Sequence, residues 1–350
     1  MKVPPEHLAM QEIAARLAEL VGVDQSEIRR ETGHGAPQRD GIIAVGPFTF
    51  VVAWKGSGLA AQVAAAVEQV QRYAADIDGA VPIVAVPFMG EAGRERCAEA
   101  DAAWLDLSGN ARIFAPGLRI LVEGKPNQFK RRGRPSSAFA PKSSRVTRWL
   151  LMHPNEPLTQ REIARATDTD EGYTSKIVSR LDHDGLIEKD QSGAIKPRDP
   201  DLLLDAWRED YDFSKHHLVR GHVAARSGDV LLRQLVGSLK KASTEFAATG
   251  LTAAWLLDRF AGFRTTTLYL AKDPTPELLA SLSFREDERG ANVWLVVPND
   301  EGVFHGACEV EGIRCVHPVQ VYLDLGAHPE RADEAASKLR TSHLHWRTNA

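Results

Sequence analysis

The sequence has few cysteines and no long apolar segment. Three cysteines, Cys97, Cys308 and Cys315, occur in 350 residues, and no Cys-x-x-Cys pair is present, which excludes a disulfide framework. No stretch approaches the roughly 20 apolar residues that a membrane-spanning helix requires, and the N-terminal segment lacks the apolar run of a signal peptide. These absences predict a soluble, cytoplasmic protein in a reducing compartment, with no membrane partner.

An overall excess of positive charge is missing too. The formal net charge is −4, so any nucleic-acid surface must be local. Between Arg119 and Arg198, sixteen lysines and arginines stand against ten acids, a net charge of +6, and no acid lies between Lys125 and Arg148. Such a like-charge block is typical of a solvated segment, and contact with phosphate is the alternative interpretation. The chain length predicts two or three domains.

Residues 1–125 predict an α/β sandwich around a mixed sheet. Apolar periodicity predicts helices over 7–20, 59–75 and 92–100. Strand-like runs occupy 41–45, 48–54, 81–86, 111–114 and 118–122. We interpret the polar, glycine-containing turn 106–110 as structural.

Asp40 begins the first of these strands and Lys55 ends the second. Metal-dependent nucleases use a carboxylate, a second acid and a lysine at adjacent strand ends to hold Mg²⁺ and activate water. The order and spacing resemble the restriction-endonuclease-like PD-(D/E)XK fold. The second acid of that pattern stands two residues before the lysine, where this chain has Ala53, and alanine cannot bind a metal.

The next predicted helix carries two further features of that resemblance. Gln69 and Tyr73 resemble the QxxxY feature of one nuclease branch, and Glu68 is a candidate for a migrated acid. Three interpretations follow for Asp40 and Lys55. They form an active nuclease site, they are a turn cap and a solvated strand end, or they are vestiges in a domain kept for structure, DNA positioning or dimerisation. We favour the last, so no catalytic residue is expected.

Residues 126–144 form a basic linker in which glycine, proline and serine interrupt every periodic pattern. Within it, Arg132-Gly133-Arg134-Pro135 matches the core of an AT-hook. Glycine lets the backbone lie on the floor of the narrow A·T minor groove, and Arg132 and Arg134 then point along the groove, where the potential is most negative. The alternative is a flexible tether with solvated charge.

Residues 145–199 predict a winged helix-turn-helix domain. A first helix ends at His153-Pro154, and Thr159 with Glu162 forms a capping box that begins the second. A third helix spans 171–183 and ends at Gly185. Two short strands, 186–189 and 194–196, then form a wing.

The third helix has one apolar and one polar face. Steps of 100° place Ile177, Val178 and Leu181 on the inner face. Small polar and cationic residues lie opposite, as a major-groove surface requires. The segment resembles bacterial winged-helix regulators, although such domains also bind proteins. The predicted DNA-binding residues are Arg132, Arg134, Thr159, Gln160, Gly172, Ser175, Lys176, Ser179, Arg180, His183, Lys189 and Lys196.

Residues 200–350 predict a third domain. Helices are expected over 202–207, 229–241, 252–260 and 329–340, strands over 264–270 and 292–297, and a hairpin over 303–316. The segments 248–254 (ATGLTAA), 292–296 (NVWLV), 318–325 (PVQVYLDL) and 331–336 (RADEAA) resemble the C-terminal domain of AbiEi-type proteins. These are antitoxins and transcriptional repressors of type IV toxin–antitoxin systems, with a domain related to nucleotidyltransferases. The resemblance implies repression of the chain's own operon through DNA binding.

Chemistry in this domain is not expected. Active nucleotidyltransferases need a Gly-Ser turn and a carboxylate pair on one strand for two Mg²⁺ ions, and Thr249-Gly250 is followed by no DxD or DxE pair. A second cluster, His305, Cys308, Cys315 and His317, has zinc-competent side chains. His305 and Cys308 would face opposite sides of a regular strand, so packing is the preferred interpretation, and no cofactor is expected.

Together these patterns predict an α/β multidomain protein with a restriction-endonuclease-like sandwich, a winged helix-turn-helix and a nucleotidyltransferase-like α+β domain. The predicted function is sequence-specific regulation of transcription, without enzyme activity. The expected partners are double-stranded operator DNA, a second copy of the chain and a cognate toxin or defence protein, in a nucleoid-associated setting. The alternatives are a metal-dependent DNA nuclease and a protein-binding adaptor of a defence or toxin–antitoxin complex.

Overall fold

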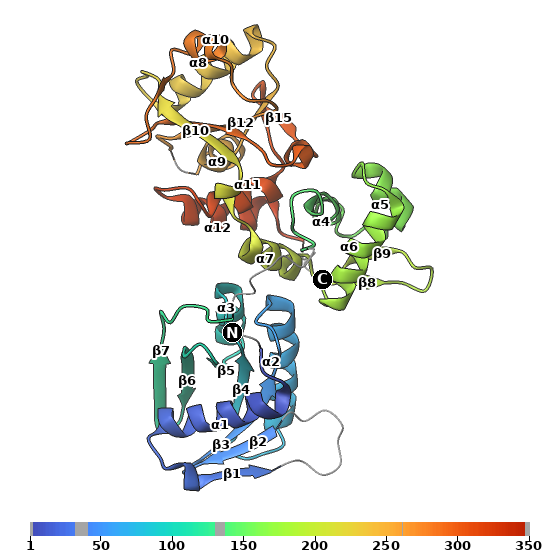
Figure 1. Cartoon of the computed structure of the whole chain (residues 1–350), viewed down its shortest axis with the longest axis vertical. Helices are drawn as coiled ribbons and strands as arrows, with labels where there is room; N and C mark the ends of the chain where they lie inside the picture. The colour runs from blue at the N-terminus through green and yellow to red at the C-terminus, as the bar shows by residue number, and fades with distance from the viewer. Residues whose placement is uncertain (1–2, 32–40, 130–136, 261, 347–350) are drawn as a thin grey trace. The chain divides into compact units, whose positions relative to one another are not determined.

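The computed structural model describes residues 3–31, 41–129, 137–260 and 262–346 (Figure 1). It divides into two compact units, 1–136 with 183–186, and 137–182 with 187–350. Asp40, Arg132 and Arg134 lie outside the described residues. Within those described ranges, no helix combines the length and the apolar character needed to cross a bilayer.

The first unit is built on a mixed sheet whose seven strands are ordered as in the chain. They are β1 (Ile28–Glu31), β2 (Gly41–Val45), β3 (Phe48–Trp54), β4 (Val81–Val86), β5 (Ala103–Asp106), β6 (Ala111–Ala115) and β7 (Leu118–Val122). The pairs β3–β4 and β4–β5 are parallel, and the other pairs are antiparallel. The mixed sheet was predicted, whereas β1 and β5 were not assigned as strands.

Helices cover both faces of this sheet. They are α1 (Glu6–Val21), α2 (Ala60–Ala74) and α3 (Glu91–Glu99), with the short η1 (Gln25–Glu27) after α1. On one face Ile13 and Leu17 of α1 pack with Phe50, and α1 runs across the sheet in Figure 1. On the other face Val63 of α2 packs with Trp104. Strand side chains alternate between these two cores because successive residues of a strand point to opposite faces.

The second unit begins with three helices and a two-stranded hairpin. These are α4 (Ser144–Met152), α5 (Gln160–Ala166), α6 (Glu171–His183), β8 (Ile187–Lys189) and β9 (Ile195–Pro197). Gly185 follows α6 with a φ of 73°, and Gly193 turns the hairpin with a φ of 82°, both in the left-handed region that favours glycine. The elements lie at the predicted positions.

The rest of the second unit contains another mixed sheet, in the order β13-β10-β14-β12-β11-β16-β15. Its strands are β10 (His217–His222), β11 (Phe246–Ala248), β12 (Thr266–Leu270), β13 (Arg285–Glu286), β14 (Val293–Val297), β15 (Cys308–Val310) and β16 (Ile313–Cys315). The helices are α7 (Pro200–Asp210), α8 (Gly228–Lys241), α9 (Gly250–Asp258), α10 (Pro276–Ser281), α11 (Pro318–Leu325) and α12 (Ala332–His343), with η2 (Phe213–Lys215) and η3 (Glu301–Phe304). Helices α9, α11 and α12 pack on one another. The chain is thus a mixed α/β protein, as predicted.

Two local predictions differ from the structure. The predicted hairpin 303–316 is wrong in its first part, because η3 occupies 301–304 and only β15 and β16 pair. The PVQVYLDL segment, to which no element was assigned, is the helix α11. Pro318 stands at its first turn, where a missing N–H costs no hydrogen bond, and the His317 side chain accepts from the Val319 N–H as an N-cap.

Candidate nucleic-acid interface

Helix α6 has one buried and one open face. Ile177, Val178 and Leu181 are buried, which confirms the predicted apolar face. Along the opposite face Lys176 and Ser179 are exposed. The other predicted residues of α6 differ in exposure, with Gly172 and His183 exposed, and Ser175 and Arg180 half-buried.

The start of α5 is held by a complete capping box. The Glu162 backbone N–H donates to the Thr159 hydroxyl at 3.2 Å, and the Thr159 N–H donates to the Glu162 carboxylate at 2.7 Å. The Thr159 N–H and the Thr159 hydroxyl both donate to the Glu162 carboxylate, and these two bonds lower the pKa of Glu162. The neighbouring Gln160 amide donates to the Glu171 carbonyl at 3.1 Å, so it joins the start of α5 to the start of α6.

A chain of hydroxyl groups crosses the turn between α5 and α6. Thr167 donates to the Ile163 carbonyl at 2.7 Å, Thr167 and Thr169 are hydrogen bonded at 2.9 Å, and Thr169 and Thr174 at 2.7 Å. The Asp170 carboxylate accepts the Tyr173 N–H at 2.7 Å. These bonds fix the start of α6 relative to α5, a role that sequence reasoning did not assign to the threonines.

The cations of this surface fall into two groups. Within the described ranges no carboxylate pairs with Lys176. On the wing, Lys189 contacts Asp182 at 2.6 Å and Lys196 contacts Glu188 at 3.0 Å. Such exposed pairs contribute only about 0–1 kcal/mol, so either lysine can exchange its carboxylate for a phosphate.

Two arginines of α4 do not belong to this surface. Arg145 and Arg148 end the acid-free stretch that was interpreted as a solvated segment, with phosphate contact as the alternative, and both are buried, at 7% and 2% exposure. For these two residues both interpretations are wrong. The Arg145 Nε and Nη2 donate to the two Asp300 carboxylate oxygens at 2.8 Å each, and this bond raises the pKa of Arg145.

Arg148 connects to a buried polar network. Its Nη2 donates to the Gln320 Oε1 at 2.6 Å, and the Gln320 amide nitrogen donates to the Asp324 carboxylate at 2.7 Å. The same carboxylate accepts the hydroxyls of Tyr211 and Thr249, each at 2.5 Å. The Tyr269 hydroxyl is a fourth donor, at 3.1 Å. Burial raises the pKa of Asp324 to about 6, against these four donors, which favour its charged form.

Two neutral histidines border this network. His216 accepts the Asn299 N–H on Nδ1 at 3.1 Å, so its Nε2 carries the proton that faces Tyr211 at 2.9 Å. His328 lies 2.8 Å from the Asp324 carbonyl through Nδ1. Burial lowers the pKa of both imidazoles to about 4.

Side chains of the protein fill the space beside the Thr249-Gly250 turn. Gly250 has a φ of 55°, and a Cβ there would lie 2.3 Å from the His328 Nε2. The Thr249 hydroxyl is engaged by Asp324, and the following strand β12 carries threonines and Tyr269 but no carboxylate.

The nuclease-like constellation is only partly described, since Asp40 lies outside the described residues. Lys55 donates from Nζ to the Gln69 Oε1 at 2.9 Å. Ala53 is buried among the apolar residues under α2, and Glu68 lies on the exposed side of that helix. That Asp40 and Lys55 are vestiges of a nuclease site stays a prediction.

Metal-ligating side chains do not converge in the described part of the chain, where no three His, Cys, Asp or Glu residues form a group that could hold an ion. Cys308 and Cys315 are cross-strand neighbours. Cys308 is exposed, whereas Cys315 is buried, and its burial raises its thiol pKa to about 12.

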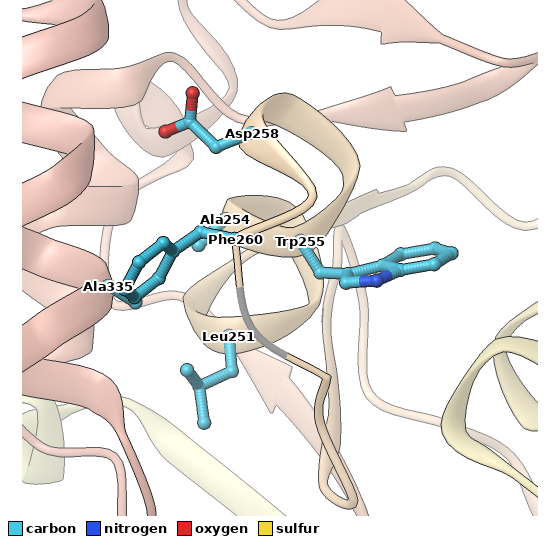
Figure 2. A pocket seen from close by; sticks show the side chains of 6 residues that line it. All are labelled: Leu251, Ala254, Trp255, Asp258, Phe260 and Ala335. Atoms are coloured by element: carbon cyan, nitrogen blue, oxygen red, sulfur yellow. The ribbon is translucent and has the colours of Figure 1, made fainter.

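A pocket lies between α9 and α12 (Figure 2). It is lined by Leu251, Ala254, Trp255, Asp258, Phe260 and Ala335. Figure 2 shows Phe260 directed toward Ala335 and Trp255 directed away from it. Its one acid, Asp258, already accepts from Ser342 at 2.8 Å and contacts His343 at 3.1 Å, so the lining is essentially apolar.

A family model described as "Transcriptional regulator, AbiEi antitoxin, Type IV TA system" covers residues 197–344. In comparisons of the chain with curated proteins and with solved structures, nothing matches. The matching description is that of a regulator and not of an enzyme, in agreement with the prediction. Residues 197–344 of this chain are therefore similar to the AbiEi family of transcriptional regulators and antitoxins of type IV toxin–antitoxin systems, and this part of the chain is called the AbiEi-type domain below.

Proposed function

We propose that this protein represses transcription by placing α6 in the major groove of an operator. The observation that carries the proposal is the open face of α6, where Lys176 and Ser179 are exposed opposite a buried apolar face. This helix follows a capped α5 and a hydrogen-bonded turn, and it precedes a domain of a regulator family in the same chain.

The side chains of this face suit base contacts. Ser175 and Ser179 carry hydroxyls that both donate and accept, and they are small enough to let the helix approach base edges. Gly172 adds no side chain at the start of α6. Lys176 supplies a charge for phosphate or for guanine acceptors, and Arg180 and His183 extend the polar face toward the end of the helix.

Residues outside α6 would contribute affinity rather than base recognition. Lys189 and Lys196 of the wing fit phosphate contacts. Thr159 and Gln160, at the start of α5, lie where a first helix crosses the backbone in helix-turn-helix proteins. In this proposal Arg132 and Arg134 enter the adjacent minor groove.

The proposal includes a two-fold symmetric complex. Two copies of the chain would bind an inverted repeat whose half-sites are one or more helical turns apart. The segments 1–125, 126–144, 145–199 and 200–350 would serve as a nuclease-derived support, a basic arm, the DNA-binding domain and the AbiEi-type domain. A cognate toxin would be regulated through its transcription.

A gel-shift titration on DNA from upstream of the gene tests this assignment. Lys176→Glu and Ser179→Glu should each abolish specific binding, because both put a carboxylate against the DNA. Lys338→Glu makes the same charge change on the exposed side of α12 and serves as the matched control. Unchanged affinity in both α6 variants would sink the proposal.

The minor-groove arm needs its own test. Arg132→Ala combined with Arg134→Ala should weaken binding most where A·T-rich sequence flanks the half-site, since a narrow minor groove attracts arginine. An equal loss on G·C-rich flanks would instead indicate plain phosphate contact.

A further inference from the structure

The buried arginines of α4 connect the proposed DNA-binding helices to the AbiEi-type domain. The Arg145 guanidinium holds Asp300 with two bonds of 2.8 Å and contacts Glu301 at 3.2 Å. Its remaining nitrogen, Nη1, lies 3.9 Å from the carboxylate of Asp168, whose side chain is 92% exposed. Asp168 belongs to the turn before α6, whereas Asp300 and Glu301 begin η3, so one side chain spans both regions.

The fit around this side chain is close. A Cβ at Gly302 would lie 2.7 Å from the Arg145 Cγ and 3.1 Å from the Arg148 Nη1. The η3 backbone therefore lies directly on α4, and only glycine leaves room for both arginines. A planar guanidinium that donates to both oxygens of one carboxylate also fixes the angle between its partners, which an ammonium group cannot do.

Arg148 provides a second connection. Its guanidinium lies 5.1 Å from the ring centre of Trp207 on α7, and it donates to Gln320 on α11. The amide of Gln320 cannot be reversed, because its oxygen faces Arg148 and its nitrogen faces Asp324. Among the residues that the structure describes, the Nε and Nη1 of Arg148 have no hydrogen-bond partner, so packing against Trp207 and the single bond to Gln320 hold this arginine.

We infer that Arg145 is a positioning residue for DNA binding, through which the AbiEi-type domain sets the orientation of α6. This inference rests on the proposed function. Its Asp300 bond holds α4 on η3, and its Asp168 contact reaches the turn that directs α6. The recognition helix and the AbiEi-type domain then act as one rigid body, and a fixed half-site spacing follows for a two-fold complex.

A direct electrostatic role for Arg145 predicts the opposite change in DNA affinity for one variant, Asp300→Asn. If Arg145 simply attracted phosphate, Asp300→Asn would remove a competing negative charge and strengthen DNA binding. If Arg145 positions α6, Asp300→Asn breaks the fork and weakens binding. Arg145→Lys separates the same two cases, because lysine keeps the charge and loses the bidentate geometry.

The experiment measures affinity of the full chain for its operator, with half-site spacing varied by one base pair at a time. We expect Asp300→Asn and Arg145→Lys each to weaken binding about tenfold and the double variant no further, since the two residues act as one unit. The salt dependence should stay unchanged, and the spacing preference should broaden. Glu309→Gln, at an exposed acid of β15, is the matched control and should retain wild-type binding.

Several outcomes would overturn the inference. They are tighter binding by Asp300→Asn, full binding by Arg145→Lys, additive losses in the double variant, or an unaltered spacing preference. Affinities are calculated from the concentration of active protein, so that a misfolded fraction does not count as weaker binding. Glu301→Gln, at the exposed edge of the cluster, is a milder variant that should show a smaller loss of affinity.

The proposed function and this inference can fail separately. If the wild-type chain binds no upstream DNA, the proposed function fails, and hydrogen exchange then tests the connection itself. Faster exchange of the amides in the α5–α6 turn in Asp300→Asn would support positioning by Arg145. Identical exchange in variant and wild type would overturn it.

Discussion

Helices α4 and α6 belong to the same predicted domain and both carry cations, yet they use them differently. Arg145 and Arg148 of α4 are buried, and they bond to Asp300 and Gln320 within the protein. Lys176 of α6 is exposed, with no carboxylate partner in the described ranges. A run of basic residues therefore does not by itself locate a DNA-binding surface. In the proposed function, the DNA-binding surface lies where charge is left without a partner inside the described fold.

The largest expected difference between the two helices is in stability. Arg145→Ala should lower the free energy of unfolding by about 3–5 kcal/mol, because it leaves Asp300, whose side chain is only 11% exposed, without its partner. Lys176→Ala should leave the urea midpoint unchanged, because the side chain is exposed. Urea titrations of both variants would measure this, and equal midpoints would contradict the different roles of Arg145 and Lys176.

The next largest effect is expected in the pH dependence of stability, to which the network around Arg148 contributes. His216 and His328 have folded pKa values near 4 against an unfolded value near 6.5, so their contribution to stability is lost as pH falls from 6.5 toward 4. Asp324, with a pKa raised to about 6, opposes this, because its protonation favours the fold as pH falls from 6 toward 4.

Asp324→Asn removes that opposing titration. The variant should lose about 2–3 kcal/mol more stability than the wild type between pH 7 and pH 4. Thermal unfolding across this range would measure the difference. A shallower pH dependence in the variant would show that the carboxyl titrates below its ordinary range instead.

A smaller effect is expected at α5, which lies between the two helices in sequence. Thr159→Ala should cost about 1 kcal/mol, because the Glu162 N–H loses its capping hydroxyl. Thr159→Ser keeps the hydroxyl and should restore most of the stability. A full loss in the serine variant would indicate that the threonine methyl group, and not the cap, is responsible.

The smallest change in stability, with a clear change in DNA binding, is expected on the wing. Lys189→Gln breaks only an exposed pair with Asp182, so the unfolding midpoint should hardly move. If Lys189 contacts a phosphate, the slope of log affinity against log salt should fall by about 0.9. Lys241→Gln, at an exposed lysine of α8, should leave that slope unaltered.

Local patterns predicted most elements of the fold and not its long-range contacts. The period-2 and period-3.6 patterns of the first unit specify their elements without help from distant residues. The strand β1 was missed because Ile28–Glu31 contains a single apolar residue and forms by pairing with β2. Helix α11 is buried on every side from Val319 to Leu325, so it has no apolar stripe from which a helix could be recognised.

The same distinction holds for the candidate site. The open face of α6 follows from 100° steps within one helix, and the burial of Ile177, Val178 and Leu181 confirms it. The pair Arg145–Asp300 joins residues 155 positions apart. The local sequence does not distinguish Arg145 from the arginines of the basic linker, because the carboxylate that pairs with it comes from the other end of the chain.

The four donors on Asp324 come from separate stretches of the chain. Tyr211 precedes η2, Thr249 follows β11, Tyr269 lies in β12 and Gln320 in α11. A truncated chain that ends before α11 would deprive the hydroxyls of Tyr211, Thr249 and Tyr269 of their shared acceptor. An AbiEi-type domain that lacks α11 should therefore not fold. A proteolytic cut before α11 should unfold the whole domain rather than remove only its C-terminal end.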